Sequence, residues 1–331
     1  MKILQDIPLK KLHTFHLDYR CKFYASIKNL DDLFEILNFD VKKKIILGNG
    51  SNSIFTKDFD GLIIHNEIEG IEIIKEDEDK ILLKVGGGVL WQDLISFCIE
   101  KKFYGLENLV GIPGSVGAAP IQNIGAYGME VSETITQVEF VKFDDLTTMT
   151  IPNSACRFAY RDSIFKHELL NKGCIINVFF LLSKIPNFNL TYGCLQNLVG
   201  KNLSLQELVT TIKKIRDEKI PDPNVLGNAG SFFQNAIIPK SKTKELLLKF
   251  PDLPFWSYDD DHDKISSAWM INMCGLKGFC QYGLKINEKS PLVILNEDCK
   301  RGEDLFRFVD EVKRKVFEEM NVVLTEEPNF F

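Results

Sequence analysis

The stretch GIPGSVGAAPIQNIGAYG, residues 111–128, is the part of the chain that decides its fold. Small residues dominate it, so it contributes little packing and costs conformational entropy when it becomes ordered. A flexible surface loop is one interpretation, but four branched aliphatic residues inside the stretch argue that it is buried. They are Ile112, Val116, Ile121 and Ile124. Because glycine lets the backbone approach another group closely, we expect main chain lying against a flat or anionic ligand.

A second glycine-rich turn, GNGSNS at residues 48–53, follows the apolar run KKIIL, which predicts a short buried strand. The turn begins like a dinucleotide-binding fingerprint, but Ser53 stands where the third glycine is required. A Walker A loop is excluded as well, because Gly200-Lys201 is followed by Asn202. What remains is a turn rich in backbone N–H groups that suits a pyrophosphate, although an ordinary turn would have the same composition.

Hydrophobic spacing predicts an α+β fold with mixed strands, without the long alternation of strand and helix found in a Rossmann domain. The expected elements are helices at 30–37 and 91–98, hairpins at 69–76 with 80–85 and at 136–143 with 147–151, a buried strand at 174–182, a helix capped by Ser204 and Glu207, a late helix at 305–316 and a strand at 322–324.

The composition is that of a globular protein, with 331 residues of which 45% are hydrophobic and 26% charged. This length suits about two domains. A net charge of -6 argues against a nucleic-acid-binding protein. We find no apolar run long enough for a membrane span and no signal-peptide region. We therefore expect no membrane segment, and we expect a cytoplasmic location.

The eight cysteines form no C-x-x-C pair, and we expect them to be buried, reduced thiols. His13 and His16 have the spacing of a metal-ligand pair, but no second pair of ligands stands nearby in the sequence. No metal site is therefore predicted.

Four more motifs follow the glycine-rich stretch. They are CRFAYRDSIFK at 156–166, LTYG at 190–193, KIPDP at 219–223 and GNAGSFFQN at 227–235. With these motifs in this order, the chain resembles the UDP-N-acetylenolpyruvoylglucosamine reductases over nearly its whole length. The LTYG motif resembles the subtype of the family in which an additional loop carries a tyrosine over the substrate.

The resemblance implies the FAD-binding fold of the vanillyl-alcohol oxidase type, in two lobes, followed by a substrate-binding α+β domain. The FAD-binding domain is then expected to span residues 1–185, with lobes at about 1–66 and 67–185, and the substrate domain to span residues 186–331. The implied enzyme is a UDP-N-acetylmuramate dehydrogenase, which transfers hydride from NADPH to FAD and then to an enolpyruvyl UDP-sugar in peptidoglycan precursor synthesis.

The resemblance also implies how the chain holds its ligands. Covalent members of this fold carry a histidine near the first glycine turn, and residues 48–53 contain none, so the FAD is expected to be non-covalent. The only expected partner is the small-molecule UDP-sugar, with no nucleic acid and no membrane, and the chain is expected to be a monomer. The implied cofactor-binding residues are Gly48, Asn49, Gly50, Ser51, Asn52, Pro113, Gly114, Ser115, Gly117, Ala118, Ile121, Gln122, Asn123, Gly125 and Ala126. The implied substrate-binding residues are Tyr127, Tyr192, Arg216, Lys219 and Asn235, with Arg216 and Lys219 facing the phosphates.

Three residues are implied in the chemistry. Arg161 resembles the residue that braces the substrate carboxylate with its planar fork, and Ser231 resembles the proton donor. Glu327 matches an acidic residue that polarises the substrate, although the choice between Glu326 and Glu327 stays open. Outside the family context these residues have plainer roles, as a surface ion pair, a helix cap and solvated charges.

The chain departs from the family pattern at three places. Asn329 replaces a usual tail arginine, His13 replaces a usual asparagine, and residues 279–282 are bulkier than usual. Two other functions share part of the pattern. An oxidase of the same fold would use oxygen but would leave the catalytic set without a role. A non-catalytic nucleotide-binding module would retain flavin without oxidising NADPH.

Overall fold

A computed structural model describes residues 2–331, which fall into two compact units. The first unit comprises Met1–Ile7, Cys21–Asn49 and Asp60–Arg216. The second comprises Pro8–Arg20, Gly50–Phe59 and Asp217–Phe331. These units are groups of residues that pack together. They do not test the domains implied by the resemblance, 1–185 and 186–331, which stay a prediction.

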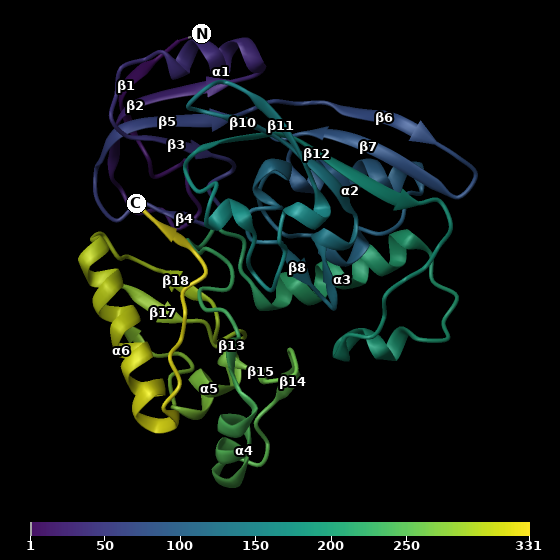
Figure 1. Cartoon of the computed structure of the whole chain (residues 1–331). Helices are drawn as coiled ribbons and strands as arrows, with labels where there is room; N and C mark the ends of the chain where they lie inside the picture. Colours follow the sequence, from purple (N-terminus) through teal and green to yellow (C-terminus); the bar gives the residue numbers. More distant parts are fainter. Residues whose placement is uncertain (1) are drawn as a thin grey trace. The chain divides into compact units, whose positions relative to one another are not determined.

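The first unit is built on two larger sheets and the two-stranded sheet β8-β9 (Figure 1). Its elements are β1 (Leu4–Pro8), β2 (Arg20–Ile27), α1 (Leu30–Leu37), β3 (Lys44–Leu47), β5 (Phe59–Asn66), β6 (Ile71–Glu76), β7 (Lys80–Gly86), α2 (Trp91–Lys101), η1 (Glu107–Leu109), η2 (Val116–Ala118), β8 (Gly125–Ala126), β9 (Met129–Glu130), η3 (Val131–Glu133), β10 (Ile135–Lys142), β11 (Thr148–Pro152), η4 (Asn153–Ala155), η5 (Ile164–Lys166), β12 (Gly173–Ser183), η6 (Gly193–Leu198) and α3 (Leu205–Lys219). Of the two larger sheets, the four-stranded one has the order β1-β2-β5-β3, and the five-stranded, antiparallel one has the order β11-β10-β12-β7-β6. The predicted helices, hairpins and buried strand of this region are confirmed. So is the capping box, in which Glu207 accepts hydrogen bonds from the amide and hydroxyl of Ser204.

Strand β12 supplies side chains to two hydrophobic cores of the first unit. Residues two apart on a regular strand share a face, so Ile176 and Val178 should point the same way. Ile176 instead packs in the core under α1, and Val178 packs in the core under α2. The pairing with β10 shifts between Glu139 and Phe140, and this bulge reverses the faces of the strand.

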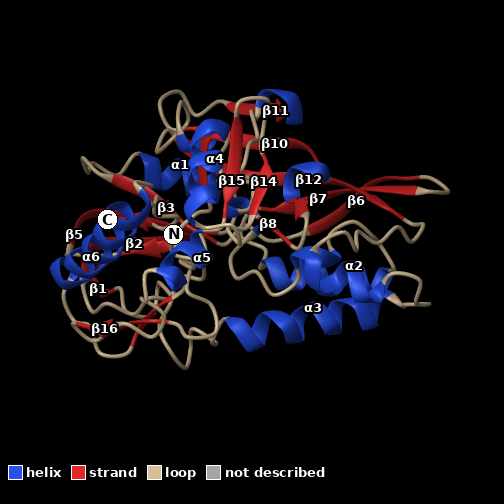
Figure 2. Cartoon of the chain, turned by 90° about the horizontal axis from the view of Figure 1, so that it is seen from below, coloured by secondary structure: helices blue, strands red, loops and turns tan. Residues whose placement is uncertain are grey.

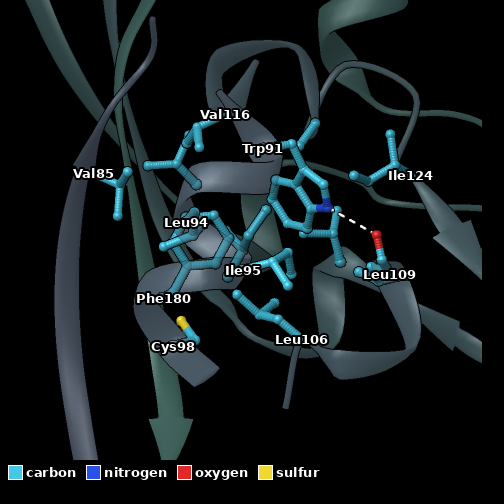
Figure 3. Close-up of a cluster of buried hydrophobic side chains, with 14 of the residues drawn as sticks. Val85, Trp91, Leu94, Ile95, Cys98, Leu106, Leu109, Val116, Ile124 and Phe180 are labelled. Carbon is cyan, nitrogen blue, oxygen red and sulfur yellow. Dashed lines mark hydrogen bonds between the residues drawn. The ribbon is translucent and has the colours of Figure 1, made fainter. Parts of the chain in front are cut away.

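The larger core is centred on Trp91, which is 1% exposed and lies 6.1 Å from the ring of Phe180 (Figure 3). Its indole Nε1 donates a 3.0 Å hydrogen bond to the carbonyl of Leu109, so the polar end of the ring is satisfied. Buried residues of α3, including Leu208 and Ile212, join the same core, and α3 lies beside α2 (Figure 2). The core therefore fixes the segment that leads directly into residues 111–128.

The second unit contains three small sheets and three helices (Figure 1). Its elements are β4 (Ser53–Ile54), β13 (Ala236–Pro239), α4 (Lys240–Lys249), β14 (Phe255–Ser257), β15 (His262–Ile265), α5 (Ser267–Met273), β16 (Cys280–Gln281), β17 (Leu284–Ile286), β18 (Ile294–Asn296), α6 (Gly302–Met320) and β19 (Asn329–Phe330). The sheets are β13-β15-β14, β16-β17-β18 and the parallel pair β19-β4. Phe15 joins this core at 6.3 Å from Phe232, which explains why residues 8–20 pack with the C-terminal half. The late helix is confirmed as α6.

The predicted strand at 322–324 is wrong. Val322 and Leu324 are buried and Val323 is 63% exposed, so the side chains alternate as they would in a strand. No neighbouring strand pairs with this segment within residues 2–331, and the backbone first pairs at an isolated bridge between Phe233 and Glu326. Alternating burial reports the two faces of an extended segment and cannot report a hydrogen-bonded ladder.

The prediction of buried thiols holds for five of the eight cysteines and is wrong for Cys194 and Cys280, which are exposed. Cys194 lies in the short helix η6, and Cys280 lies on the two-residue edge strand β16. Neither element has enough apolar neighbours to cover its thiol. Among residues 2–331, no helix has the length and hydrophobicity that a membrane crossing requires.

Candidate active site

The first glycine turn lies directly on the long glycine-rich stretch. A Cβ placed on Gly48 would lie 2.4 Å from the Oγ of Ser115 and 3.7 Å from the Cβ of Ala118. A larger residue at position 48 would require the hydroxyl of Ser115 to rotate away. The amides of Asn49 and Gly50 form no hydrogen bond with any group of residues 2–331. Within the first unit, Gly48 and residues 115–118 are thus neighbours beside the unbonded amide of Asn49, a donor of the kind that binds a pyrophosphate.

Part of the glycine-rich stretch is small because it packs on another backbone. The amide of Gly117 donates a 2.8 Å hydrogen bond to the carbonyl of Gly87, and a Cβ on Gly117 would lie 2.9 Å from that oxygen. The amide of Val116 donates in the same way to the carbonyl of Val89 at 2.9 Å. The turn at residues 86–88 therefore positions the stretch, a role that the sequence did not reveal.

Asn123, a predicted cofactor residue, uses most of its side chain to hold the site together. It is fully buried and has a left-handed φ of 45°. Its Nδ2 donates to Glu130 Oε2 at 2.7 Å and to the carbonyl of Ala159 at 3.1 Å, and its Oδ1 accepts from the amide of Ser132 at 3.0 Å. These bonds occupy both donors and one acceptor position of the amide. The predicted contact of Asn123 with the flavin stays a prediction, with little of the side chain left to make it.

Arg161 is held against the same stretch. Its backbone has a left-handed φ of 55° at a tight turn, where Ala159 and Asp162 exchange hydrogen bonds of 3.1 Å in both directions. The Nη2 of Arg161 donates a 2.8 Å hydrogen bond to the carbonyl of Gly125, and the carbonyl of Arg161 accepts a 3.0 Å hydrogen bond from Lys166 Nζ. Strained backbone of this kind is typical of functional sites. The guanidinium is therefore positioned beside β8, among the predicted cofactor residues.

Two predicted substrate residues, Tyr127 and Tyr192, are neighbours. Their rings meet edge to face with centroids 5.6 Å apart, although 65 positions of sequence separate them. Tyr192 is 44% exposed, and desolvation by burial of its hydroxyl is the main cause that raises its pKa. The predicted tyrosine loop is thus docked on the end of the glycine-rich stretch within the first unit.

Arg216, another predicted substrate residue, is anchored at the start of the glycine-rich stretch. Its Nε donates a 2.8 Å hydrogen bond to the carbonyl of Gly111. Gly111 has a left-handed φ of 74°, which favours glycine, and a Cβ on it would lie 3.0 Å from the Cδ of Arg216. The helix α3 therefore delivers a cation to residues 111–128 of the same unit.

The predicted catalytic residues Ser231 and Glu327 lie on adjacent segments of the second unit. The amide of Glu327 donates to the carbonyl of Phe232 at 2.8 Å, and Ser231 pairs with Val293 in an isolated bridge. Asn52 Nδ2 donates to the carbonyl of Glu327 at 3.2 Å. A predicted cofactor residue and two predicted catalytic residues are thus brought together here, while Arg161 belongs to the first unit.

The remaining predicted residues of the second unit are also positioned by specific contacts. The carbonyl of Lys219 accepts a 2.8 Å hydrogen bond from Asn287 Nδ2, and Asn235 Oδ1 accepts from the amide of Ser267 at 3.2 Å. Glu326, the alternative to Glu327, forms a 2.8 Å ion pair with Lys313 Nζ. That ion pair directs Glu326 toward helix α6.

His13, which departs from the family pattern, is buried within the second unit. It is 2% exposed, its Nε2 bonds to the carbonyl of Leu17 at 3.1 Å, and its ring meets Phe55 edge on at 5.5 Å. Its Cα would lie 2.8 Å from a Cβ on Gly50. Burial lowers the pKa of His13 to about 4, so the ring is neutral at physiological pH.

We expect His13 to make the protein sensitive to acid. Its folded-state pKa of about 4 lies below the unfolded value of 6.5, so the unfolded chain binds the proton more readily. Stability is therefore lost as the pH falls from 6.5 toward 4, by about 2 kcal/mol at pH 5. Urea unfolding near pH 7 and pH 5 measures this loss of stability, which should be smaller in His13→Asn than in the natural chain. An equal loss in both proteins would contradict this role.

Comparisons with known proteins match both halves of the chain to known families. A model of an FAD binding domain matches residues 22–150, and a model of the UDP-N-acetylenolpyruvoylglucosamine reductase C-terminal domain matches residues 222–331. The chain is 38% identical to the UDP-N-acetylenolpyruvoylglucosamine reductase of Amoebophilus asiaticus, over 99% of each chain. It is 39% identical to that of Pseudoalteromonas translucida, over 96% of this chain and 94% of the relative. The solved reductase of Thermus caldophilus has the same fold, with a TM-score of 0.69 at 19% identity, covering 100% of this chain and 98% of that one.

The fold and the two domain matches define an FAD-binding oxidoreductase with a separate C-terminal domain. At this identity over nearly the full length of its relatives, the chain belongs to the UDP-N-acetylenolpyruvoylglucosamine reductase family. The predicted family, fold class, enzyme class and FAD cofactor are confirmed.

Proposed function

We propose that the chain reduces the enolpyruvyl group of UDP-N-acetylglucosamine enolpyruvate to the lactyl ether of UDP-N-acetylmuramate, with NADPH as the hydride donor, in the cytoplasm. The observation that carries the proposal is the similarity to a UDP-N-acetylenolpyruvoylglucosamine reductase over 99% of the chain. The contact of Gly48 with Ser115 and Ala118 supports it, because it brings together two segments that are both proposed to bind FAD.

FAD, when bound, supplies hydride transfer from NADPH to the substrate. Hydride added at the terminal vinyl carbon leaves negative charge on the adjacent carbon and its carboxylate, which must be stabilised and protonated. Arg161 is proposed to hold the carboxylate through its planar fork. Its hydrogen bond to the carbonyl of Gly125 supports this role, because it orients the guanidinium before substrate arrives.

Ser231 is proposed to donate the proton to the carbon next to the carboxylate. A neutral hydroxyl is a weak acid, so it suits a strongly basic carbon and needs a neighbouring charge. Glu327 is the proposed neighbour, since its amide is bonded to the carbonyl of Phe232, the residue after Ser231. The ion pair of Glu326 with Lys313 supports Glu327 over Glu326.

The phosphates and sugar of the substrate need cations and aromatic faces. Arg216 and Lys219 are proposed to face the phosphates, and Tyr127, Tyr192 and Asn235 to contact the rest of the UDP-sugar. The edge-to-face pairing of the two tyrosines supports a shared contact with one ligand.

A stopped-flow experiment without oxygen tests the proposed reaction. We expect NADPH to bleach the absorbance of the bound flavin and the enolpyruvyl UDP-sugar to restore it. Recovery that requires oxygen would indicate an oxidase of the same fold. A flavin that NADPH does not bleach would indicate a non-catalytic binding module.

A further inference from the structure

Asn108, which the reaction above does not use, is buried where the tyrosine loop meets the glycine-rich stretch. It belongs to η1, three residues before residue 111, and is 1% exposed. Its Nδ2 donates to the carbonyl of Tyr127 at 2.9 Å and to the carbonyl of Asn189 at 2.8 Å. Both hydrogens of the amide are therefore used. One binds the segment that carries Tyr127, and the other binds the segment that carries Tyr192.

Asn189 continues this connection at the surface. Its Nδ2 donates to the carbonyl of Gly128 at 2.9 Å, and its Oδ1 accepts from the amide and the hydroxyl of Thr191 at 3.1 and 2.7 Å. A Cβ on Gly128 would lie 3.4 Å from the Cβ of Tyr192, so the two segments touch. Two asparagines thus form a ladder of hydrogen bonds between the tyrosine loop and the turn that contains Tyr127.

The chemistry of Asn108 indicates a purpose other than packing. Its Oδ1 is buried without a hydrogen-bond partner among residues 2–331, which costs solvation energy that an apolar side chain would not lose. Turning the amide over would place that oxygen against two carbonyls, so its orientation is fixed by the two acceptors. The loop has apolar anchors of its own, since Leu195 is fully buried in the core of the first unit. Packing already holds the loop in the core, and the hydrogen bonds of Asn108 therefore fix the exact position of its backbone.

We propose that Asn108 is a positioning residue for substrate binding, which sets the geometry of Tyr127 and Tyr192 by fixing the carbonyls of Tyr127 and Asn189. The proposal rests on the proposed function, in which both tyrosines contact the UDP-sugar. Asn108 donates to backbone carbonyls and does not itself take part in the transfer of hydride or of the proton. Its loss therefore weakens binding of substrate and leaves the reduction of flavin by NADPH unchanged.

The test compares Asn108→Ala with a matched variant, Asn153→Ala, in the full-length protein loaded with FAD. Asn153 Nδ2 also donates to two backbone carbonyls of the same unit, those of Ser132 and Ile135, at 2.8 Å each, and neither acceptor belongs to the tyrosine loop. We expect Asn108→Ala to raise the KM for enolpyruvyl UDP-N-acetylglucosamine about ten-fold or more, with flavin reduction by NADPH within about two-fold of the natural rate. Asn153→Ala should leave that KM unchanged.

A second measurement tests the role of Asn108 independently of enzyme activity. Hydrogen exchange of the amides of residues 187–199 should be faster in Asn108→Ala than in the natural chain and in Asn153→Ala. Asn189→Ala, at the exposed end of the ladder, should change the KM and the exchange in the same direction without altering the core. An unchanged KM in Asn108→Ala, or an equal rise in Asn153→Ala, would overturn the inference. If the natural chain fails to turn over the UDP-sugar, the proposed function is contradicted, and unchanged exchange of the loop would then overturn the role of Asn108 separately.

Discussion

Replacing Ser231 with alanine should leave the bleaching of flavin by NADPH intact and slow its recovery with the enolpyruvyl UDP-sugar by about 10²–10⁴-fold, the usual contribution of a general acid. The first half-reaction needs no proton from the protein at the substrate carbon, whereas the second cannot finish without one. Ser231 follows Gly230, which has a left-handed φ of 69°, and its partner in the bridge is Val293. Alanine can adopt the same backbone at residue 231, so the change removes only the hydroxyl.

A serine with a structural role in the same unit provides the control for Ser231→Ala. Ser266 Oγ accepts a 3.2 Å hydrogen bond from the amide of Trp269 and caps helix α5. Ser266→Ala should cost about 1 kcal/mol of stability and change neither half-reaction. Stopped-flow absorbance measures both steps in each variant. Equal slowing of the two steps in Ser231→Ala would show that Ser231 supports the flavin site as a whole and is not the proton donor.

Much of the fold could be predicted from the sequence because local patterns specify it. The spacing of Leu305, Phe308, Val309 and Val312 on one face predicts helix α6, and those residues are buried in the second unit. The glycine-rich stretch is recognisable because its composition is incompatible with ordinary packing. The aliphatic residues inside it predict its burial, and Val116 and Ile124 are buried, whereas its contact with Gly48 joins two segments that no local pattern links.

What could not be predicted depends on contacts between distant parts of the chain. The bulge that reverses the faces of β12 depends on its pairing with β10, and no residue in the sequence of β12 predicts the bulge. The hydrogen bond from Asn108 to Asn189 spans 81 positions, and an asparagine next to a glycine-rich segment has no distinctive signal. Gly117 is predicted to bind the cofactor, and its missing side chain also accommodates the backbone of Gly87, a contact that composition does not identify. Local sequence indicates that a close approach is needed but does not identify the approaching group.

Two substitutions of Arg161 should distinguish what its charge and its planar fork each contribute to the reduction of the UDP-sugar. Arg161→Ala should slow recovery of the flavin by the UDP-sugar about 10²–10³-fold and raise the KM for that substrate, because the charge developing beside the carboxylate loses its preorganised donors. Reduction of flavin by NADPH should change little, since the carboxylate is absent in that step. The backbone at residue 161 has a φ of 55° in the natural chain, and this strain is common to arginine and alanine.

Arg161→Lys is the more informative variant, because it keeps the charge and removes the planar fork. A lysine ammonium is a point charge and cannot make a bidentate contact with a carboxylate while also replacing the 2.8 Å hydrogen bond from Arg161 Nη2 to the carbonyl of Gly125. We therefore expect Arg161→Lys to lose most of what Arg161→Ala loses. Arg157→Lys is the matched control, since Arg157 also has a left-handed φ, of 49°, and pairs at the surface with Glu168. Near-natural kinetics in Arg161→Lys would show that charge alone is needed, and slowing of both half-reactions would place Arg161 in the support of the flavin site.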